Sequence, residues 1–158
     1  MDQLRTLQKP LALTSADKRD ARTQFGALCY RVRKDKPQVL LISSRGTGRW
    51  IIPKGWPMAG STPAEAATIE AWEEAGVRGR VHGPCLGFYS YDKRIESGEK
   101  FPCIVAVFAV SVAKLADDYP EADQRKRKWV SVKKAAKMVK EPELARIISR
   151  FSPRILRI

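Results

Sequence analysis

Three glutamates with the spacing of one helix face, Glu70, Glu73 and Glu74, stand just before the helix-stopping Gly76. With about 100° between successive residues, their carboxylates share about a third of the helix circumference, where like charges repel. A positive group is therefore expected beside them. Mg²⁺ and similar hard cations take carboxylate and carbonyl oxygens and keep part of their shell for water and phosphates. The cluster predicts metal-assisted phosphate chemistry, with a solvated acidic helix face as the alternative.

The segment that carries these glutamates has helix signals at both ends. Thr62 and Glu65 have the spacing of a capping box, and Pro63 between them suits the first helical position. Several alanines raise the helix propensity and allow close approach of a neighbouring loop or ligand. Gly76 suits the left-handed position that ends a helix. We therefore expect a helix from Pro63 to the residue before Gly76.

The chain from Gly55 to Val77 resembles the Nudix box, written G-x5-E-x7-R-E-U-x-E-E-x-G-U with U apolar. Two positions depart from it, because Ser61 replaces the first glutamate of the pattern and Ile69 replaces its arginine. The resemblance covers roughly residues 24 to 140. Within the family, the chain most resembles the diphosphoinositol polyphosphate phosphohydrolase branch. The segments that carry it are FGALCYR at 25–31, VLLISSR at 39–45, RWIIPKGW at 49–56, EEAGVRG at 73–79 and RKRKWVSVKKAAKMV at 125–139.

This resemblance implies hydrolysis of a nucleoside or inositol diphosphate linked to another moiety, with Mg²⁺ or Mn²⁺ as cofactor. Glu70 and Glu74 would be metal ligands, together with the backbone carbonyl of Lys54 or Gly55. Glu73 would be the general base, because an ionised carboxylate beside a metal ion can take a proton from the attacking water.

The same resemblance implies a phosphate-rich substrate held by basic and hydroxyl groups around the mouth of the site. Arginine suits phosphate because its planar fork donates two parallel hydrogen bonds, and a Ser-Ser-Arg turn adds further donors. The candidate substrate-binding residues are Arg22, Ser43, Ser44, Arg45, Arg49, Lys54 and Lys100.

The departure at position 69 has a physical consequence. An arginine there could hold Glu73 one turn later, whereas Ile69 cannot. We expect a less firmly oriented Glu73 and slower catalysis, or a substitute cation from another element. The candidates for that cation are Lys54, Lys93, Arg94 and Lys100.

Charge is the second informative feature, since 30 Lys and Arg against 17 Asp and Glu give a net charge of +13. Such a field steers anionic polyphosphates toward a cleft, and it would attract RNA as well. One basic cluster, Lys18, Arg19 and Arg22, precedes the first strand. The other, residues 125–128, precedes Trp129 and is either a solvated strand entrance or functional.

Composition and motifs exclude several other classes. Cys29, Cys85 and Cys103 are scattered without a C-x-x-C pair, which favours buried free thiols in a reducing cytoplasm. His82 is the only histidine, so a zinc site or a His-based triad has little support. The longest apolar run, near residues 103–110, is far short of the roughly 20 residues that span a bilayer. The first 22 residues mix charges throughout and lack a signal-peptide core.

The chain of 158 residues suits one cored domain. Pattern alone indicates an α/β or α+β fold, and the resemblance specifies an α/β/α sandwich with a mixed sheet. We expect an N-terminal arm at 1–23, a domain at 24–152 and a C-terminal tail at 153–158. The expected strands are 25–33, 38–43, 49–52, 81–91, 102–112 and 127–131, and further helical patterns cover 132–140 and 142–151.

Three hypotheses of function follow. The first is a metal-dependent pyrophosphohydrolase acting on diphosphoinositol polyphosphates or dinucleoside polyphosphates. The second keeps the enzyme but makes its substrate an RNA 5′ end, for which the basic charge is equally suitable. The third, prompted by Ser61 and Ile69, is a non-catalytic module that binds phosphorylated ligands. The sequence leaves the oligomeric state open.

Overall fold

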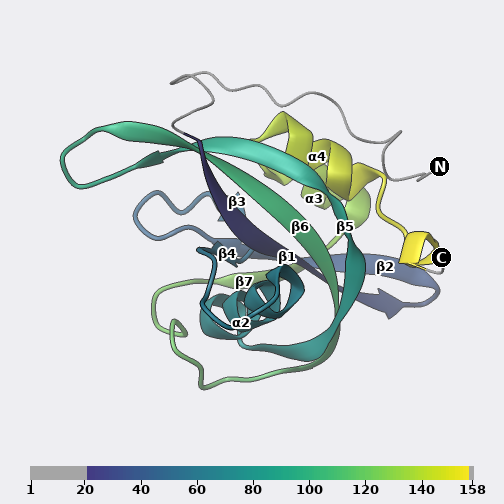
Figure 1. Ribbon diagram of the computed structural model, residues 1–158. Coiled ribbons are helices and arrows are strands. Elements are labelled where there is room, and N and C mark those ends of the chain that lie inside the picture. Colours follow the sequence, from purple (N-terminus) through teal and green to yellow (C-terminus); the bar gives the residue numbers. More distant parts are fainter. Residues whose placement is uncertain (1–20, 157–158) are drawn as a thin grey trace.

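A mixed seven-stranded sheet separates the glutamate-bearing helix from the C-terminal helices (Figure 1). The computed structural model describes residues 21–156. The strands are β1 (Arg22–Arg33), β2 (Lys36–Ser43), β3 (Trp50–Ile51), β4 (Lys54–Gly55), β5 (Val77–Arg94), β6 (Lys100–Leu115) and β7 (Arg127–Ser131). The helices are α2 (Pro63–Ala75), α3 (Val132–Met138) and α4 (Pro142–Ser149), followed by the 3-10 helix η2 (Pro153–Leu156).

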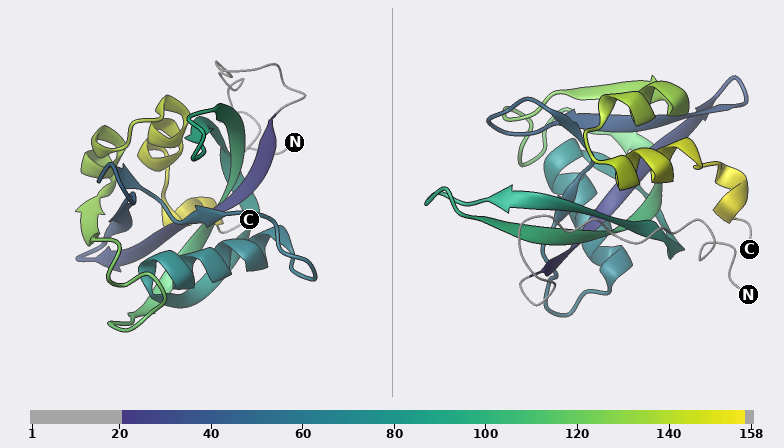
Figure 2. Two further views of the ribbon diagram at one scale, coloured as in Figure 1. Left: turned by 90° about the vertical axis from the view of Figure 1, so that its left-hand side faces the viewer. Right: turned by 90° about the horizontal axis from the view of Figure 1, so that it is seen from above.

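The main path through the sheet runs β3-β2-β1-β6-β5, with β4 paired to β1 and β7 paired to β2. Strands β1 and β6 are parallel, whereas the other strand pairs are antiparallel. Figure 2 shows α2 on one side of the sheet and α3 with α4 on the other. This confirms the expected α/β/α arrangement with a mixed sheet.

Alternation along the central strands supplies both cores. In β1, Ala27 and Cys29 belong to the cluster under α2, whereas Leu28 and Tyr30 belong to the cluster under α3 and α4. Strand residues that point alternately to two buried faces produce nearly continuous apolar runs, and the runs in β1, β2 and β6 are of this kind.

Helix α2 begins and ends as its sequence predicts. The Thr62 hydroxyl accepts a hydrogen bond from the Glu65 backbone N–H at 3.1 Å, and Glu65 Oε1 accepts one from the Thr62 N–H at 2.8 Å. Gly76 closes the helix in the left-handed conformation, with φ of 66°. The helix buries alanines against the sheet together with Glu70 and Glu74. The acidic face is therefore turned inward rather than solvated.

Several boundaries differ from the sequence prediction. Strand β1 begins at Arg22, inside the segment expected to be an arm, because Arg22 pairs with Cys103 on β6. Strands β5 and β6 form a hairpin that extends past the expected strands at both ends. At the end near Arg94 and Lys100 the residues are polar and exposed, so no apolar alternation there predicts the pairing. Most of the N-terminal arm and the last two residues of the tail lie outside the described residues.

His82 and the three cysteines, none of which is predicted to be catalytic or metal-binding, lie in strands of the sheet. His82 lies in β5, where its ring nitrogen is 3.3 Å from the Tyr30 hydroxyl. Cys29 and Cys103 are buried, and Cys85 is partly buried. No helix within residues 21–156 is both long and apolar enough to cross a membrane.

We predict that Gly76→Ala destabilises the fold more than Gly60→Ala does. Both glycines have positive φ, so alanine costs about 1–2 kcal/mol of backbone strain at either site. Only at Gly76 would the new Cβ overlap a neighbour, the Tyr119 ring, whereas the space around Gly60 is open. Free energies of unfolding from urea titrations should therefore differ by at least about 1 kcal/mol. Equal losses would contradict the packing of Tyr119 on the end of α2.

Candidate active site

Strand β4 lies so close to helix α2 that it needs a glycine. A Cβ at Gly55 would overlap the carboxyl carbon and both oxygens of Glu70. Only glycine permits such an approach of backbone to side chain. The contact fixes the Glu70 carboxylate against the backbone of β4.

Glu74 is held from two sides. Its Oε1 accepts a hydrogen bond from the Lys54 backbone N–H at 3.2 Å, and its Oε2 lies 3.6 Å from Arg125 Nη2. The Arg125 side chain is 6% exposed and also contacts Glu121 Oε1 at 2.8 Å and the Ser43 carbonyl at 3.1 Å. Burial raises the pKa of Glu74, while Arg125 and Lys54 oppose that rise.

The pair Glu70 and Glu74 has the chemistry of a divalent cation site. Burial raises the pKa of Glu70 to about 8, and the adjacent Glu74 and Glu73 add to the rise. Both carboxylates therefore need a proton or a cation. Within residues 21–156, no three His, Cys, Asp or Glu side chains form a ready-made metal group. Two carboxylates still fit Mg²⁺, which commonly takes one or two and completes its shell with water and phosphate. The Gly55 contact and this donor set fit the expected Mg²⁺ or Mn²⁺.

Glu73 stands apart from this pair. It is partly buried, and its side chain makes no hydrogen bond or ion pair with any described residue. Ile69, one turn earlier, provides no cation. None of the four expected substitutes, Lys54, Lys93, Arg94 and Lys100, forms an ion pair with Glu73 in the described part of the chain. The buried cation of the site is Arg125 instead, and it contacts Glu74 rather than Glu73.

The three residues of the Ser-Ser-Arg segment at the end of β2 differ in burial and in their hydrogen-bond partners. Ser43 is buried, and its hydroxyl accepts a hydrogen bond from the Lys126 backbone N–H at 2.8 Å. Ser44 faces Thr47 across the turn at 2.5 Å between their hydroxyl oxygens. Arg45 is exposed, with Nη1 3.0 Å from Gln124 Oε1 and Nε 3.9 Å from Glu121. Of the three, Arg45 is the residue best placed to meet a solvent-borne phosphate.

The remaining expected substrate residues form two separate groups. Arg49 lies 3.3 Å from Glu141 Oε2, and the Lys54 ammonium lies 4.8 Å from the centre of the Tyr91 ring. Arg22 and Lys100 are exposed at the starts of β1 and β6, and the Arg22 guanidinium covers the Phe101 ring at 4.2 Å. The structure thus places these residues on separate elements rather than gathering them at one point.

Two residues at the site were not predicted as site residues from the sequence. Arg125 was seen only as a member of a basic run, where four neighbouring cations look alike. Its position two residues before β7 and the apolar pattern of that strand are the only signals that it points inward. Glu141 precedes Pro142 and resembles a helix-capping residue, yet its side chain makes no capping bond.

A comparison with protein families identifies the family of this chain. The model of the NUDIX domain matches residues 22–151. The chain belongs to the Nudix family. The matched residues include helix α2, Gly55 in β4 and the strands that position them.

Two curated Nudix relatives are 30% and 34% identical to this chain over the aligned residues. Diphosphoinositol polyphosphate phosphohydrolase 3-alpha of Mus musculus is 30% identical over 133 residues, covering 83% of this chain and 77% of the relative. Nudix hydrolase 13, mitochondrial, of Arabidopsis thaliana is 34% identical over 130 residues, covering 72% of this chain. The match spans 64% of the plant relative's length.

Solved structures confirm the Nudix fold. The C. elegans Ap4A hydrolase superposes with a TM-score of 0.60 at 21% identity, covering 85% of this chain and 98% of that one. The E. coli dihydroneopterin triphosphate pyrophosphohydrolase gives a TM-score of 0.62 at 16% identity, covering 84% and 95%. At these identities the likeness concerns the fold.

We predict that Glu70→Gln flattens the pH dependence of stability of the metal-free protein. The folded pKa of Glu70, about 8, lies above the ordinary value of 4.5, so the folded state binds this proton more tightly than the unfolded state. Its stabilisation is complete below pH 4.5 and is lost as pH rises through 8. Melting temperatures in EDTA should fall more steeply over this window in the wild type than in the variant. Parallel curves would show that Glu70 titrates normally.

We also predict that Arg125→Met costs about 3 kcal/mol of unfolding free energy, because it leaves the buried Glu74 without its cation. Adding Glu74→Gln should recover most of that loss. Arg127→Met is the control, since Arg127 bonds the carbonyls of Ala75 and Ala116 instead. Glu74→Gln should not rescue it. Additive losses in the Arg125 cycle would mean that the two side chains are not coupled.

Proposed function

We propose that this Nudix protein is a divalent-metal-dependent pyrophosphohydrolase that cleaves a phosphoanhydride bond in a highly anionic substrate. The substrate classes are diphosphoinositol polyphosphates and dinucleoside polyphosphates. The observation that carries the proposal is the approach of Gly55 to Glu70 beside Glu74, which concentrates two buried carboxylates where the Nudix box requires them. The names of similar proteins, a diphosphoinositol polyphosphate phosphohydrolase and an Ap4A hydrolase, support these classes.

Each side chain of the helix has a separate task in this proposal. Glu70 and Glu74 hold Mg²⁺ or Mn²⁺ together with the β4 backbone, and Lys54 N–H and Arg125 keep the Glu74 carboxylate in place. A bound divalent ion supplies positive charge for the pyrophosphate oxygens and lowers the pKa of water. Glu73 accepts the proton of the attacking water. Because no described cation holds Glu73, its carboxylate is free to act as a base but is weakly oriented.

The distribution of charge supports an anionic ligand. Arg22, Arg45 and Lys100 are exposed and can meet phosphates from solvent first. The net charge of +13 adds a long-range field whose effect falls with ionic strength. The same field favours the second candidate, hydrolysis at an RNA 5′ end. The unsupported Glu73 beside Ile69 favours the third candidate, a binding module without turnover.

We propose a cytoplasmic location for this activity. The three unpaired thiols support it, because reducing compartments keep cysteines in this state.

The proposed activity is tested by phosphate release from a panel of substrates with Mg²⁺ and, separately, Mn²⁺. The panel holds diphosphoinositol polyphosphate, diadenosine hexaphosphate, nucleoside triphosphates and triphosphorylated RNA. We expect turnover of an inositol or dinucleoside substrate, and a loss of about a hundredfold or more in Glu73→Gln. The variant, purified identically, controls for contaminants.

Other outcomes identify the competing functions. Turnover confined to triphosphorylated RNA would assign the RNA-end activity. If the wild type binds a ligand and melts cooperatively but turns over no substrate, the protein is a phosphate-binding module and the hydrolase function is refuted.

A further inference from the structure

Strand β4 presents different groups to the two faces of the sheet. Gly55 and the Lys54 N–H face the carboxylates of α2, whereas the Lys54 side chain lies against Tyr91, which packs on the core under α3 and α4. The Tyr91 hydroxyl donates a hydrogen bond of 2.6 Å to Gln24 Oε1. A polar cluster therefore adjoins the metal-binding carboxylates across a single short strand.

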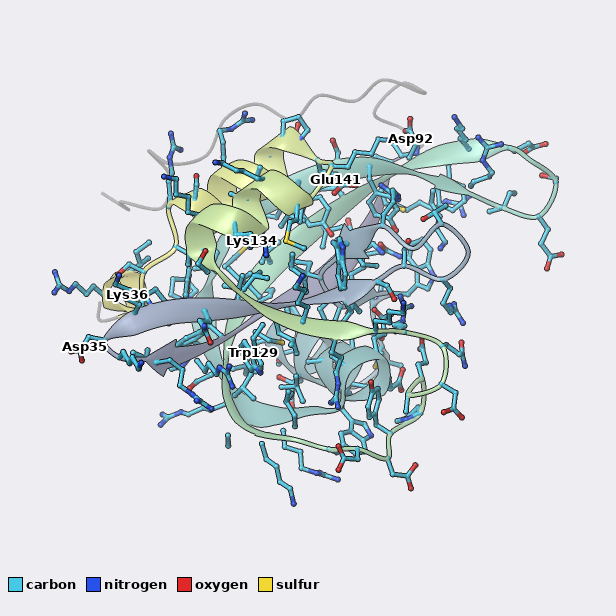
Figure 3. The ribbon with its side chains drawn as sticks, turned by 180° about the vertical axis from the view of Figure 1, so that it is seen from behind. Asp35, Lys36, Asp92, Trp129, Lys134 and Glu141 are labelled. Atoms are coloured by element: carbon cyan, nitrogen blue, oxygen red, sulfur yellow. The ribbon has the colours of Figure 1, made fainter. Side chains whose placement is uncertain are left out.

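Glu141 belongs to this cluster and carries an unused oxygen. Its side chain is 10% exposed, with Oε2 at 3.3 Å from Arg49 Nη1. The other oxygen, Oε1, is buried and has no hydrogen-bond partner within the described residues 21–156. Figure 3 places Glu141 where the helical layer adjoins the β5–β6 hairpin. An unsatisfied buried carboxylate oxygen is costly, and it does not cap α4. Packing alone gives no reason for a glutamate here.

Lys54 is similarly under-used. Within residues 21–156 its ammonium makes the contact with Tyr91 but no ion pair. Burial lowers its pKa, and Glu74 and Glu141 are the nearby charges that oppose this effect. The Lys54 ammonium and Glu141 Oε1, neither of which has a hydrogen-bond partner among residues 21–156, thus lie in one partly buried region. A ligand that satisfies both must carry an anionic oxygen for Lys54 and a hydrogen-bond donor for Glu141.

We propose that Glu141 determines substrate class by accepting a hydrogen bond from a hydroxyl or amino group on the part of the substrate that is not hydrolysed, while Lys54 and Arg49 bind its phosphates. This inference rests on the proposed hydrolase function and narrows its substrate to a nucleoside polyphosphate. Arg49 is 40% exposed and can turn from Glu141 to an incoming phosphate, which frees the carboxylate for the nucleoside.

The chemistry of the two substrate classes differs at this point. A nucleoside offers ribose hydroxyls and, in adenosine, an amino group as donors. An inositol ring phosphorylated at every carbon offers no hydroxyl and would bring anionic oxygens toward Glu141. Like charges across a partly buried contact oppose binding, so the carboxylate acts against the inositol ligand as well as for the nucleoside.

The test compares kcat/KM for diadenosine hexaphosphate and for diphosphoinositol pentakisphosphate in the wild type and in Glu141→Gln. We expect the ratio of kcat/KM for the nucleotide to kcat/KM for the inositol substrate to exceed one in the wild type. In the variant this ratio should fall about ten- to a hundredfold, which corresponds to the loss of one hydrogen bond to a charged group. Glu143→Gln is the matched control, a buried glutamate two residues later in the first turn of α4, and should leave the ratio unchanged.

Inhibition constants against the nucleotide substrate identify the donor. ADP is compared with 2′,3′-dideoxy-ADP, which lacks the hydroxyls, and with purine riboside 5′-diphosphate, which lacks the amino group. One analogue should inhibit the wild type about tenfold less well than ADP, and this difference should vanish in Glu141→Gln.

The melting temperature separates recognition from structure. Because Glu141 Oε1 has no partner, Glu141→Gln should keep or raise the melting temperature. A lower melting temperature with an equal loss on both substrates would make Glu141 structural and overturn the proposal, as would an unchanged ratio. Absence of turnover on every polyphosphate in the wild type would instead refute the hydrolase function.

Discussion

The approach of Gly55 to the Glu70 carboxylate is the contact on which the remainder of the site depends. It requires α2 to lie flat on the sheet, which the buried alanines of that helix permit because they are small. It also requires β4 to be fixed, which its pairing with Phe25 and Gly26 on β1 achieves. Any side chain at position 55 would overlap the Glu70 carboxylate and so separate the strand from the helix.

The site therefore combines groups that are unfavourable in isolation. Two glutamates are buried beside each other on one face of β4, and a lysine and a glutamate with an unpaired oxygen are buried on the other. Such groups reduce the stability of the ligand-free protein, and a metal ion and substrate would offset that cost. Residues that bind ligands are often selected at the expense of stability, and the neutral variants at positions 70 and 141 measure that exchange directly.

Local signals in the sequence were sufficient for helix α2, whereas the α/β/α sandwich was expected only from the family resemblance. Thr62, Pro63 and Gly76 define α2 because capping depends on residues close in the chain. The role of Arg125 depends on the path of the chain between β6 and β7, which local pattern does not contain. Its neighbours in the basic run are chemically alike, and only tertiary packing selects the one that is buried. Glu141 escaped prediction for the same reason, since its partner Arg49 comes from a distant turn.

The segment between β6 and β7 carries Glu121 and Arg125 back to the end of α2, where the Glu121 N–H bonds the Glu73 carbonyl at 3.0 Å. Glu70, Glu73 and Glu74 are all present once α2 has been synthesised, yet Arg125, the cation that neutralises Glu74, follows much later in the chain. A nascent or truncated chain ending before Arg125 would contain the three glutamates without the cation that holds Glu74. The ion pair between Glu74 and Arg125 can therefore form only after six of the seven strands have been synthesised.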